Sequence, residues 1–225
     1  MEAVQFLKQL ESNSVDILFT DPPYFIPSDY YGTRKQWPKN LSDMGILDGY
    51  FWLFFQECKR IVKPSGAILS FCDDHSYPIF FCHVYPFLRT VRAIVWDKGH
   101  PFLGRDWRHQ YEFIMFAPRT DRKGKTTGYG DVIRYDSVKI GERKHPAQKP
   151  VGLITKILRD CMQNGDSVLC DPFSGTGAIG QAAKGLGFTV LESDYDAGLL
   201  DTSPPNLDSP WAPPSGGMVS DSEGP

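Results

Sequence analysis

The sequence lacks the features of a membrane, secreted or metal-binding protein. Its longest apolar run, residues 49–55, falls well short of the ~18–20 residues that span a bilayer, and the first residues lack the basic start and apolar stretch of a signal peptide. The five cysteines form no CxxC pair and the five histidines no HExxH or HxH spacing, whereas metal ligands usually come in closely spaced pairs. We therefore expect a cytoplasmic protein with buried, reduced cysteines and no metal.

The composition excludes a wholly disordered chain. Hydrophobic residues make up 41% of the sequence and aromatic residues 13%, enough to build a core. Its 225 residues correspond to one domain. Residues 203–225 differ, because they are rich in Pro, Ser and Gly and contain no Lys or Arg. We expect a folded domain at residues 1–202 and a disordered tail at residues 203–225.

Charge is unevenly distributed around a net charge of −3. Residues 89–149 hold 14 Lys and Arg against seven Asp and Glu. Such a basic segment can be the footprint of a phosphate backbone. It can equally be an ordinary solvated face, and charge alone leaves both interpretations open.

Short β-like runs alternate with helix-like runs along the chain, which predicts an α/β fold with a largely parallel sheet and right-handed crossovers. Residues 118–144 have neither period and are expected to form a surface insertion. The expected strands are residues 15–20, 67–71, 90–96, 111–117, 167–170 and 189–192. The expected helices are residues 47–62, part of 76–88, 150–162 and 175–186.

The first motif that could carry chemistry is Asp21-Pro22-Pro23-Tyr24, directly after a predicted strand. Ligands of open α/β sheets bind outside the carboxyl ends of strands. The Asp21 carboxylate and the Pro22 carbonyl would form a pair of acceptors suited to an NH₂ group, and Tyr24 offers a flat face for stacking a ring. The same four residues could also be a plain strand-ending turn.

The second motif follows the strand at residues 167–170. Its glycines would let the backbone approach a ligand, and a helix N-terminus favours a carboxylate or phosphate. With Gly180 and Glu192 it makes a formal dinucleotide-binding pattern, although four residues separate the strand from the first glycine. An acid at the strand end suits an ammonium group, which S-adenosylmethionine carries and NAD lacks, and Glu192 would accept from ribose hydroxyls. The motif consists of Asp171, Pro172, Phe173, Ser174, Gly175, Thr176 and Gly177.

The third motif, His145-Pro146-Ala147-Gln148-Lys149-Pro150, leads into a predicted helix. Alone it reads as a helix start with an exposed Lys149.

In this order the three motifs resemble the beta-class amino-methyltransferases of DNA, the adenine-N6 and cytosine-N4 modifying enzymes of restriction-modification systems. Their order is a DPPY box, a target-recognition insertion, an HPxxKP box and a DPFxGxG box, and the resemblance covers about residues 5–196. It implies a Rossmann-like, S-adenosylmethionine-dependent methyltransferase sheet, circularly permuted so that the catalytic box precedes the cofactor box. The basic segment at residues 118–144 takes the place of the target-recognition insertion.

The resemblance also implies the reaction and its residues. A methyl group would pass from S-adenosylmethionine to the exocyclic amine of adenine, less often cytosine, in duplex DNA whose target base has left the helix. Lys149 would pair with the cofactor's carboxylate, and a homodimer is left open. The implied catalytic residues are Asp21, Pro22, Pro23 and Tyr24; the cofactor residues are Asp171 to Gly177, Glu192, His145 and Lys149; the phosphate contacts are Arg119, Arg122, Lys123 and Lys125.

Two departures from the family pattern bear on activity. Family members carry a Gly-Asp strand before the segment that begins here at Met1, and a helix after the segment that ends here at Glu192. We expect weak cofactor binding and an exposed strand at residues 189–192 as a result. A non-catalytic DNA-binding remnant, an NAD-dependent oxidoreductase and a methyltransferase of RNA or protein stay open as alternatives.

Overall fold

The computed structural model describes residues 2–23, 44–88, 90–102, 106–123, 129–142, 145 and 147–195, without the side chains of residues 44–47 and 140. Everything below concerns these residues. The predicted site residues Tyr24 and Lys125, Pro146 of the third motif, and the predicted tail at residues 203–225 lie outside them.

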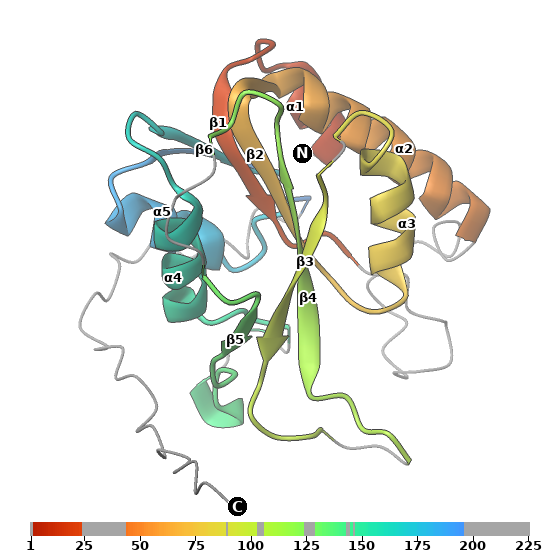
Figure 1. Ribbon diagram of the computed structural model, residues 1–225, viewed down its shortest axis with the longest axis vertical. Coiled ribbons are helices and arrows are strands. Elements are labelled where there is room, and N and C mark those ends of the chain that lie inside the picture. Colours follow the sequence, from red (N-terminus) through yellow and green to blue (C-terminus); the bar gives the residue numbers. More distant parts are fainter. Residues whose placement is uncertain are drawn as a thin grey trace, which may run out of the picture.

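The described chain forms a seven-stranded sheet with helices on both faces (Figure 1). The strand order is β5-β3-β4-β2-β1-β6-β7. The strands are β1 Val15–Thr20, β2 Val62–Cys72, β3 Arg92–Asp97, β4 Tyr111–Pro118, β5 Val132–Arg134, β6 Val168–Asp171 and β7 Thr189–Glu192. The helices are α1 Ala3–Lys8, α2 Met44–Ile61, α3 Ser76–Val84, α4 Val151–Cys161 and α5 Ala178–Gly185, with a short 3-10 helix at Ile140–Glu142.

Strand direction places the ends of several strands together. β2, β1, β6 and β7 are parallel neighbours, so Cys72, Thr20, Asp171 and Glu192 end at one edge, which we call the carboxyl edge. β4 is antiparallel to both β2 and β3, so β3 ends and β4 begins at that same edge. β1 precedes β6 by most of the chain yet pairs directly with it, as the permuted fold requires.

Each face of the sheet has its own apolar core. In β1, Leu18 points to the face covered by α1, α2 and α3, while Ile17 and Phe19 point to the face covered by α4 and α5. All six residues of β1 are buried, which explains its nearly unbroken apolar run. The first core is rich in aromatic rings, with the Phe51 and Phe80 centroids 4.7 Å apart.

Asp16 is the one charged residue in β1 and is 4% exposed. Its carboxylate accepts hydrogen bonds from Lys63 Nζ at 2.7 Å, Ser167 N at 3.1 Å and Val168 N at 2.9 Å. Burial raises the pKa of this carboxyl, but these donors outweigh burial and leave the pKa below its ordinary value. Asp16 therefore fastens β1 to β2 and β6 as an ion.

The structure confirms the predicted strands and helices and corrects their details. The glycine-started helix begins at Ala178 instead of Gly175, because Gly175 and Gly177 have φ of +48° and +78°, outside the helical region. Residues 63–66, which lie between the predicted helix at 47–62 and the predicted strand at 67–71, belong to β2, where the register with β1 is irregular. Part of the predicted insertion forms β5, which adds to the outer side of β3.

The cysteines are free, and one departs from expectation. Cys58, Cys72 and Cys170 are buried, Cys161 is half-buried, and Cys82 is exposed. Cys82 lies on α3, where the face opposite the core meets solvent. Among the described residues, no helix combines the length and apolar character needed to cross a membrane.

Candidate functional site

A chain of four alternating charges begins at Asp21, just past β1 on the carboxyl edge. Asp21 Oδ2 lies 2.8 Å from Lys149 Nζ, and the same ammonium lies 3.3 Å from Glu112 Oε2. The other oxygen of Glu112 lies 2.5 Å from Lys98 Nζ. The four residues come from β1, the approach to α4, β4 and the residue after β3, so the fold alone brings them together.

Both central charges of this chain are stabilised by their neighbours. Burial lowers the pKa of Lys149, but the carboxylates of Asp21 and Glu112 raise it by more, so it lies above its ordinary value. Burial raises the pKa of Glu112, but Lys149 and Lys98 outweigh burial and hold it below its ordinary value. Lys149 therefore presents a fixed positive charge to the Asp21 carboxylate.

The third motif contributes more than a helix start. Lys149 was expected to be exposed if the motif were only a helix start, but it is 6% exposed and lies over the Phe71 ring at 5.1 Å. Its contacts are with Asp21 and Glu112, and its role toward a cofactor carboxylate stays a prediction. His145, at the start of the motif, is half-buried and accepts from Ala147 N at 3.2 Å.

Sequence reasoning did not single out Glu112 or place Lys98 in the site. A signal for Glu112 existed, since it is the only charged residue in the apolar strand β4. A lone acid in such a strand needs a buried cation.

Asp171 at the end of β6 is fully buried and only half satisfied. Its Oδ1 accepts from Thr20 Oγ1 at 2.8 Å and from Phe173 N at 3.2 Å. Its Oδ2 is buried and has no hydrogen-bond partner within the described chain. Burial raises the pKa of Asp171 to about 8, against the lowering effect of those two hydrogen bonds, and the nearby carboxylates of Asp21 and Glu192 add to the rise. A buried oxygen in this state is suited to a cationic donor from a ligand.

The turn after Asp171 is held open by glycines and tied to the end of β7. Gly175 donates its N–H to Asp194 Oδ2 at 2.7 Å, and Ser174 donates through N and Oγ to the Ser193 carbonyl at 3.0 and 3.1 Å. Apart from its two chain neighbours, no atom of the described residues lies within 4 Å of the place where a Cβ at Gly175 would be. Of the rest of the motif, Pro172 and Gly177 are buried, Thr176 is half-buried, and the Phe173 ring packs against Phe54 at 5.3 Å.

Glu192 lies beside Asp171, because the two residues pair in the parallel ladder of β6 and β7. Its carboxylate forms an ion pair with Lys184 at 2.7 Å. A Cβ at Gly180 would collide with this carboxylate. The third glycine of the formal dinucleotide pattern thus makes room for Glu192, a packing role instead of a phosphate contact.

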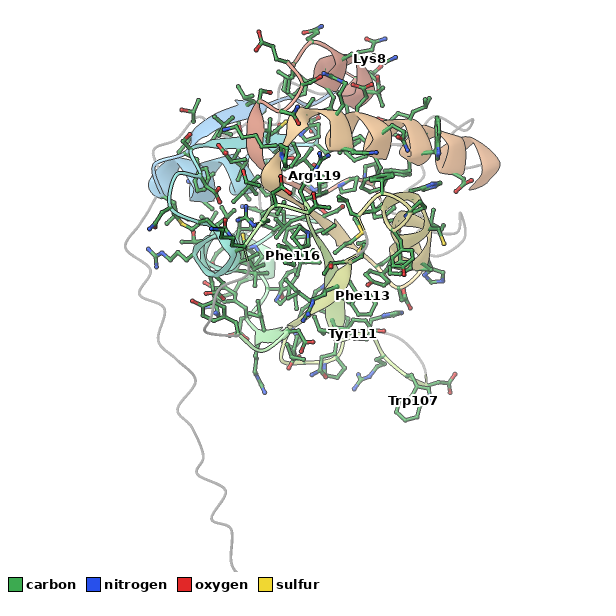
Figure 2. The ribbon with its side chains drawn as sticks, turned by 45° about the horizontal axis from the view of Figure 1, so that its top comes forward. Lys8, Trp107, Tyr111, Phe113, Phe116 and Arg119 are labelled. Atoms are coloured by element: carbon green, nitrogen blue, oxygen red, sulfur yellow. The ribbon has the colours of Figure 1, made fainter. Side chains whose placement is uncertain are left out.

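Three of the four predicted phosphate contacts, Arg119, Arg122 and Lys123, follow β4 and so leave it at the end opposite the site, as Figure 2 shows for Arg119. Arg119 donates to the Lys59 carbonyl at 2.6 Å. The Arg122 side chain is 3% exposed, pairs with Asp166 at 2.9 Å and donates to two backbone carbonyls. These contacts fasten surface segments together, so we do not carry Arg119 and Arg122 forward as phosphate contacts; Lys123 is exposed.

One group of possible metal ligands lies within the described residues, at the end of β2. It consists of Asp73, Asp74 and His75, with ligand atoms within 4.8 Å of one another. His75 Nδ1 lies 3.0 Å from Asp74 Oδ1, and both residues are exposed. Exposed acidic groups like these are common without a metal, and the expectation of a metal-free protein stays a prediction.

Comparison with known proteins gives one family and several relatives. A family model described as DNA methylase matches residues 15–201. The chain is 25% identical to the Type II methyltransferase M.HinfI of Haemophilus influenzae, over 92% of this chain and 66% of that enzyme. It is 26% identical to the Type II methyltransferase M2.MboI of Moraxella bovis, over 89% of this chain and 83% of that enzyme.

Solved structures share the fold. The M1.HpyAVI–SAM complex superimposes with a TM-score of 0.61 at 19% identity, covering 88% of this chain and 93% of that one. The cytosine-N4-specific PvuII DNA methyltransferase gives a TM-score of 0.68 at 13% identity, covering 87% of this chain and 80% of that one. The Rossmann-like methyltransferase sheet expected from the motifs is therefore confirmed as the fold.

Proposed function

The chain belongs to the DNA methylase family, as the order of its three motifs indicated and the family match over residues 15–201 confirms, and from this premise we propose that it transfers a methyl group from S-adenosylmethionine to an exocyclic amine of a DNA base. One observation carries the proposal. Thr20 Oγ1 donates to Asp171 Oδ1 at 2.8 Å, so the strand that ends in Asp21-Pro22-Pro23 is joined directly to the strand that ends in the half-satisfied Asp171. An acceptor for the amine and an acceptor for a cation thus lie side by side at the carboxyl edge.

The residues present fit the cofactor. Asp171 Oδ2, buried and without a partner in the described chain, would accept from the ammonium group of S-adenosylmethionine. The open side of Gly175 would let the backbone approach the methionine part, and Glu192 would accept from the ribose hydroxyls. We retain the other predicted cofactor residues as parts of the same pocket: Pro172, Phe173, Ser174, Thr176, Gly177, His145 and Lys149.

The residues of the first motif would carry out the catalysis. The lone pair of an exocyclic amine is delocalised into its ring, which makes the amine a weak nucleophile. Asp21 and the Pro22 carbonyl would accept the two amine hydrogens and localise the lone pair for in-line attack. When bound, S-adenosylmethionine would supply an electrophilic methyl on its sulfonium, the N–C bond forming as the S–C bond breaks. Asp21 would accept the amine proton that is lost.

Lys149 has a positioning role in this scheme. Its ammonium fixes Asp21 Oδ2 and so orients the carboxylate that would accept from the amine. Glu112 also pairs with Lys149, so the ammonium is held between two carboxylates.

The finer points are also proposals. We propose that the target base is adenine ahead of cytosine and that it is flipped out of duplex DNA. We also propose that Tyr24, which lies outside the described residues, stacks on this base. Lys123 remains a candidate phosphate contact among the described residues, with Lys125 beyond them. We also propose a cytoplasmic protein, with a homodimer left open.

The decisive experiment is transfer of a tritiated methyl group onto unmethylated genomic DNA, followed by nucleoside analysis. We expect labelled N6-methyladenine from the parent chain and none from Asp21→Ala. Labelled N4-methylcytosine would instead identify cytosine as the target base. Cofactor binding in calorimetry without any transfer would instead favour the non-catalytic remnant.

A further inference from the structure

Between β3 and β4 the structure describes residues 98–102 and 106–110, which lie beyond the carboxyl edge; we call these described residues the β3–β4 arm. Figure 2 shows Trp107 standing away from the body of the protein, beyond Tyr111 at the start of β4. Arg119, at the far end of β4, lies on the other side of the sheet's centre in the same view.

The base of the arm is fixed. Lys98 N donates to the Gln110 carbonyl at 2.8 Å, one step beyond the last β3–β4 pair, and Phe102 N donates to the His109 carbonyl at 2.9 Å. Gln110 Nε2 also donates to Asp97 Oδ1 at 2.9 Å. The arm is therefore held as an extension of the sheet at its base.

The tip of the arm presents a large aromatic ring that the described fold does not use. Trp107 is 97% exposed, compared with 50% for Trp52 on α2. Asp106 has φ of +54°, a left-handed turn that precedes the ring. The next two residues, Arg108 and His109, are exposed as well, so a cation flanks the ring.

The arm is tied to the proposed catalytic carboxylate. Lys98 at its base contacts Glu112, which contacts Lys149, which contacts Asp21. Trp107 lies five positions before Glu112 in the sequence, so their Cα atoms are at most about 18 Å apart. A duplex that delivers a base to Asp21 passes within reach of this ring.

We propose that the β3–β4 arm docks on duplex DNA beside the target nucleotide, and that Trp107 stacks on a base left uncovered when the target base leaves the helix. This inference rests on the proposed function and names the surface that meets its substrate. Removing a base from the stack is unfavourable, and aromatic or apolar side chains inserted at base steps compensate for the lost stacking. Arg108 is placed to meet the adjoining phosphates.

The test compares Trp107→Ala with Trp52→Ala, a matched loss of an exposed tryptophan on the outer side of α2. The probe is unmethylated genomic DNA in short fragments, with bound fraction and tritiated methyl transfer as readouts. Trp107→Ala should bind about 5- to 150-fold more weakly and transfer correspondingly less at limiting DNA, whereas Trp52→Ala should behave as the parent. Trp107→Tyr should restore most of the loss, since a stacking face returns.

Tryptophan emission gives an independent readout. DNA should quench the emission of the parent and of Trp52→Phe, and most of that quenching should disappear in Trp107→Phe. Parent-like DNA binding, transfer and quenching in the Trp107 variants would overturn the inference while leaving the proposed function intact. A change of oligomeric state in Trp107→Ala would overturn it too, because the ring would then contact a second copy. If DNA quenches the tryptophan emission of the parent but the parent transfers no methyl group, the proposed function is refuted and the inference about the β3–β4 arm stands.

Discussion

Replacing Asp171 by Asn should stabilise the ligand-free protein at pH 8 and weaken its binding of S-adenosylmethionine. The carboxyl group is fully buried with one oxygen unpaired, so its ionisation opposes folding. The same unpaired charge would make it the acceptor for the cofactor's ammonium. Stability and binding are thus expected to move in opposite directions in one variant.

The direction of the pH effect follows from the two pKa values. The pKa of an Asp carboxyl is ~3.9 in an unfolded chain. In the folded protein the pKa of Asp171 is raised to about 8, and burial is the main cause. Between these values the folded protein holds a proton that the unfolded chain has released. The free energy of unfolding therefore falls as pH rises through this window, and the contribution of Asp171 is fully present only below the unfolded value.

The magnitude has two opposing parts. The two pKa values differ by about four, so the free energy of unfolding falls by at most ~5 kcal/mol between acid and pH 8. An Asn would place N–H donors where Oδ2 finds no partner, which costs about 1–3 kcal/mol. The net gain for Asp171→Asn is about 2–4 kcal/mol at pH 8 and reverses sign toward pH 4, where the folded-state carboxyl is protonated and ionisation of the unfolded chain adds little.

Thermal unfolding of both proteins from pH 4 to pH 8 would test this, with calorimetric titration of S-adenosylmethionine at pH 8. Asp16→Asn is the matched control at the other end of the same sheet. The pKa of Asp16 is lowered because its hydrogen bonds outweigh burial, so that variant should lose stability at neutral pH, with a loss that shrinks in acid. A stability difference for Asp171→Asn that does not change with pH would refute the reasoning.

Three further substitutions test the charged residues. Asp21→Ala should reduce methyl transfer at least ~100-fold, as when a group that stabilises a transition state is lost, with little change in calorimetric cofactor affinity; near-normal turnover would exclude its role. Glu112→Gln leaves Lys149 with one carboxylate and should lower the free energy of unfolding by about 3–5 kcal/mol, read from urea denaturation, and unchanged stability would contradict the charge chain. Arg122→Ala should likewise lower the free energy of unfolding by about 3–5 kcal/mol without changing the salt dependence of DNA binding. Lys123→Ala, at an exposed position, should leave stability unchanged.

The sequence predicted most of the fold because the local signals agreed with the packing. The predicted strand at residues 15–20 is β1, buried on both faces, and the predicted helix at residues 47–62 is α2, whose Phe51 and Phe55 lie in the core. Where the prediction erred, backbone geometry decided. Gly175 and Gly177 adopt positive φ, which apolar periodicity does not reveal, so α5 begins later than the pattern indicated.

The order of the motifs predicted the family, and each motif alone left its role open. Lys149 illustrates the limit. Its neighbours in sequence, Gln148 and Pro150, indicate only a helix start, while its partners Asp21 and Glu112 lie 128 and 37 positions away in the printed sequence. Pairing over such separations depends on strand order, and strand order is a property of the folded sheet.

The basic segment at residues 89–149 shows most clearly why a charge count cannot locate a nucleic-acid surface. β4 crosses this segment and runs antiparallel to β2, so residues just before β4 reach the carboxyl edge and residues just after it reach the opposite edge. Arg108 precedes β4 on the side of the carboxyl edge and is exposed beside Trp107, whereas Arg122 follows β4 and its side chain is buried against Asp166. The excess of positive charge is thus divided between two ends of the sheet, one free to meet phosphates and the other used to hold the fold together. Strand direction, which the segment's composition does not encode, assigns each cation to its end.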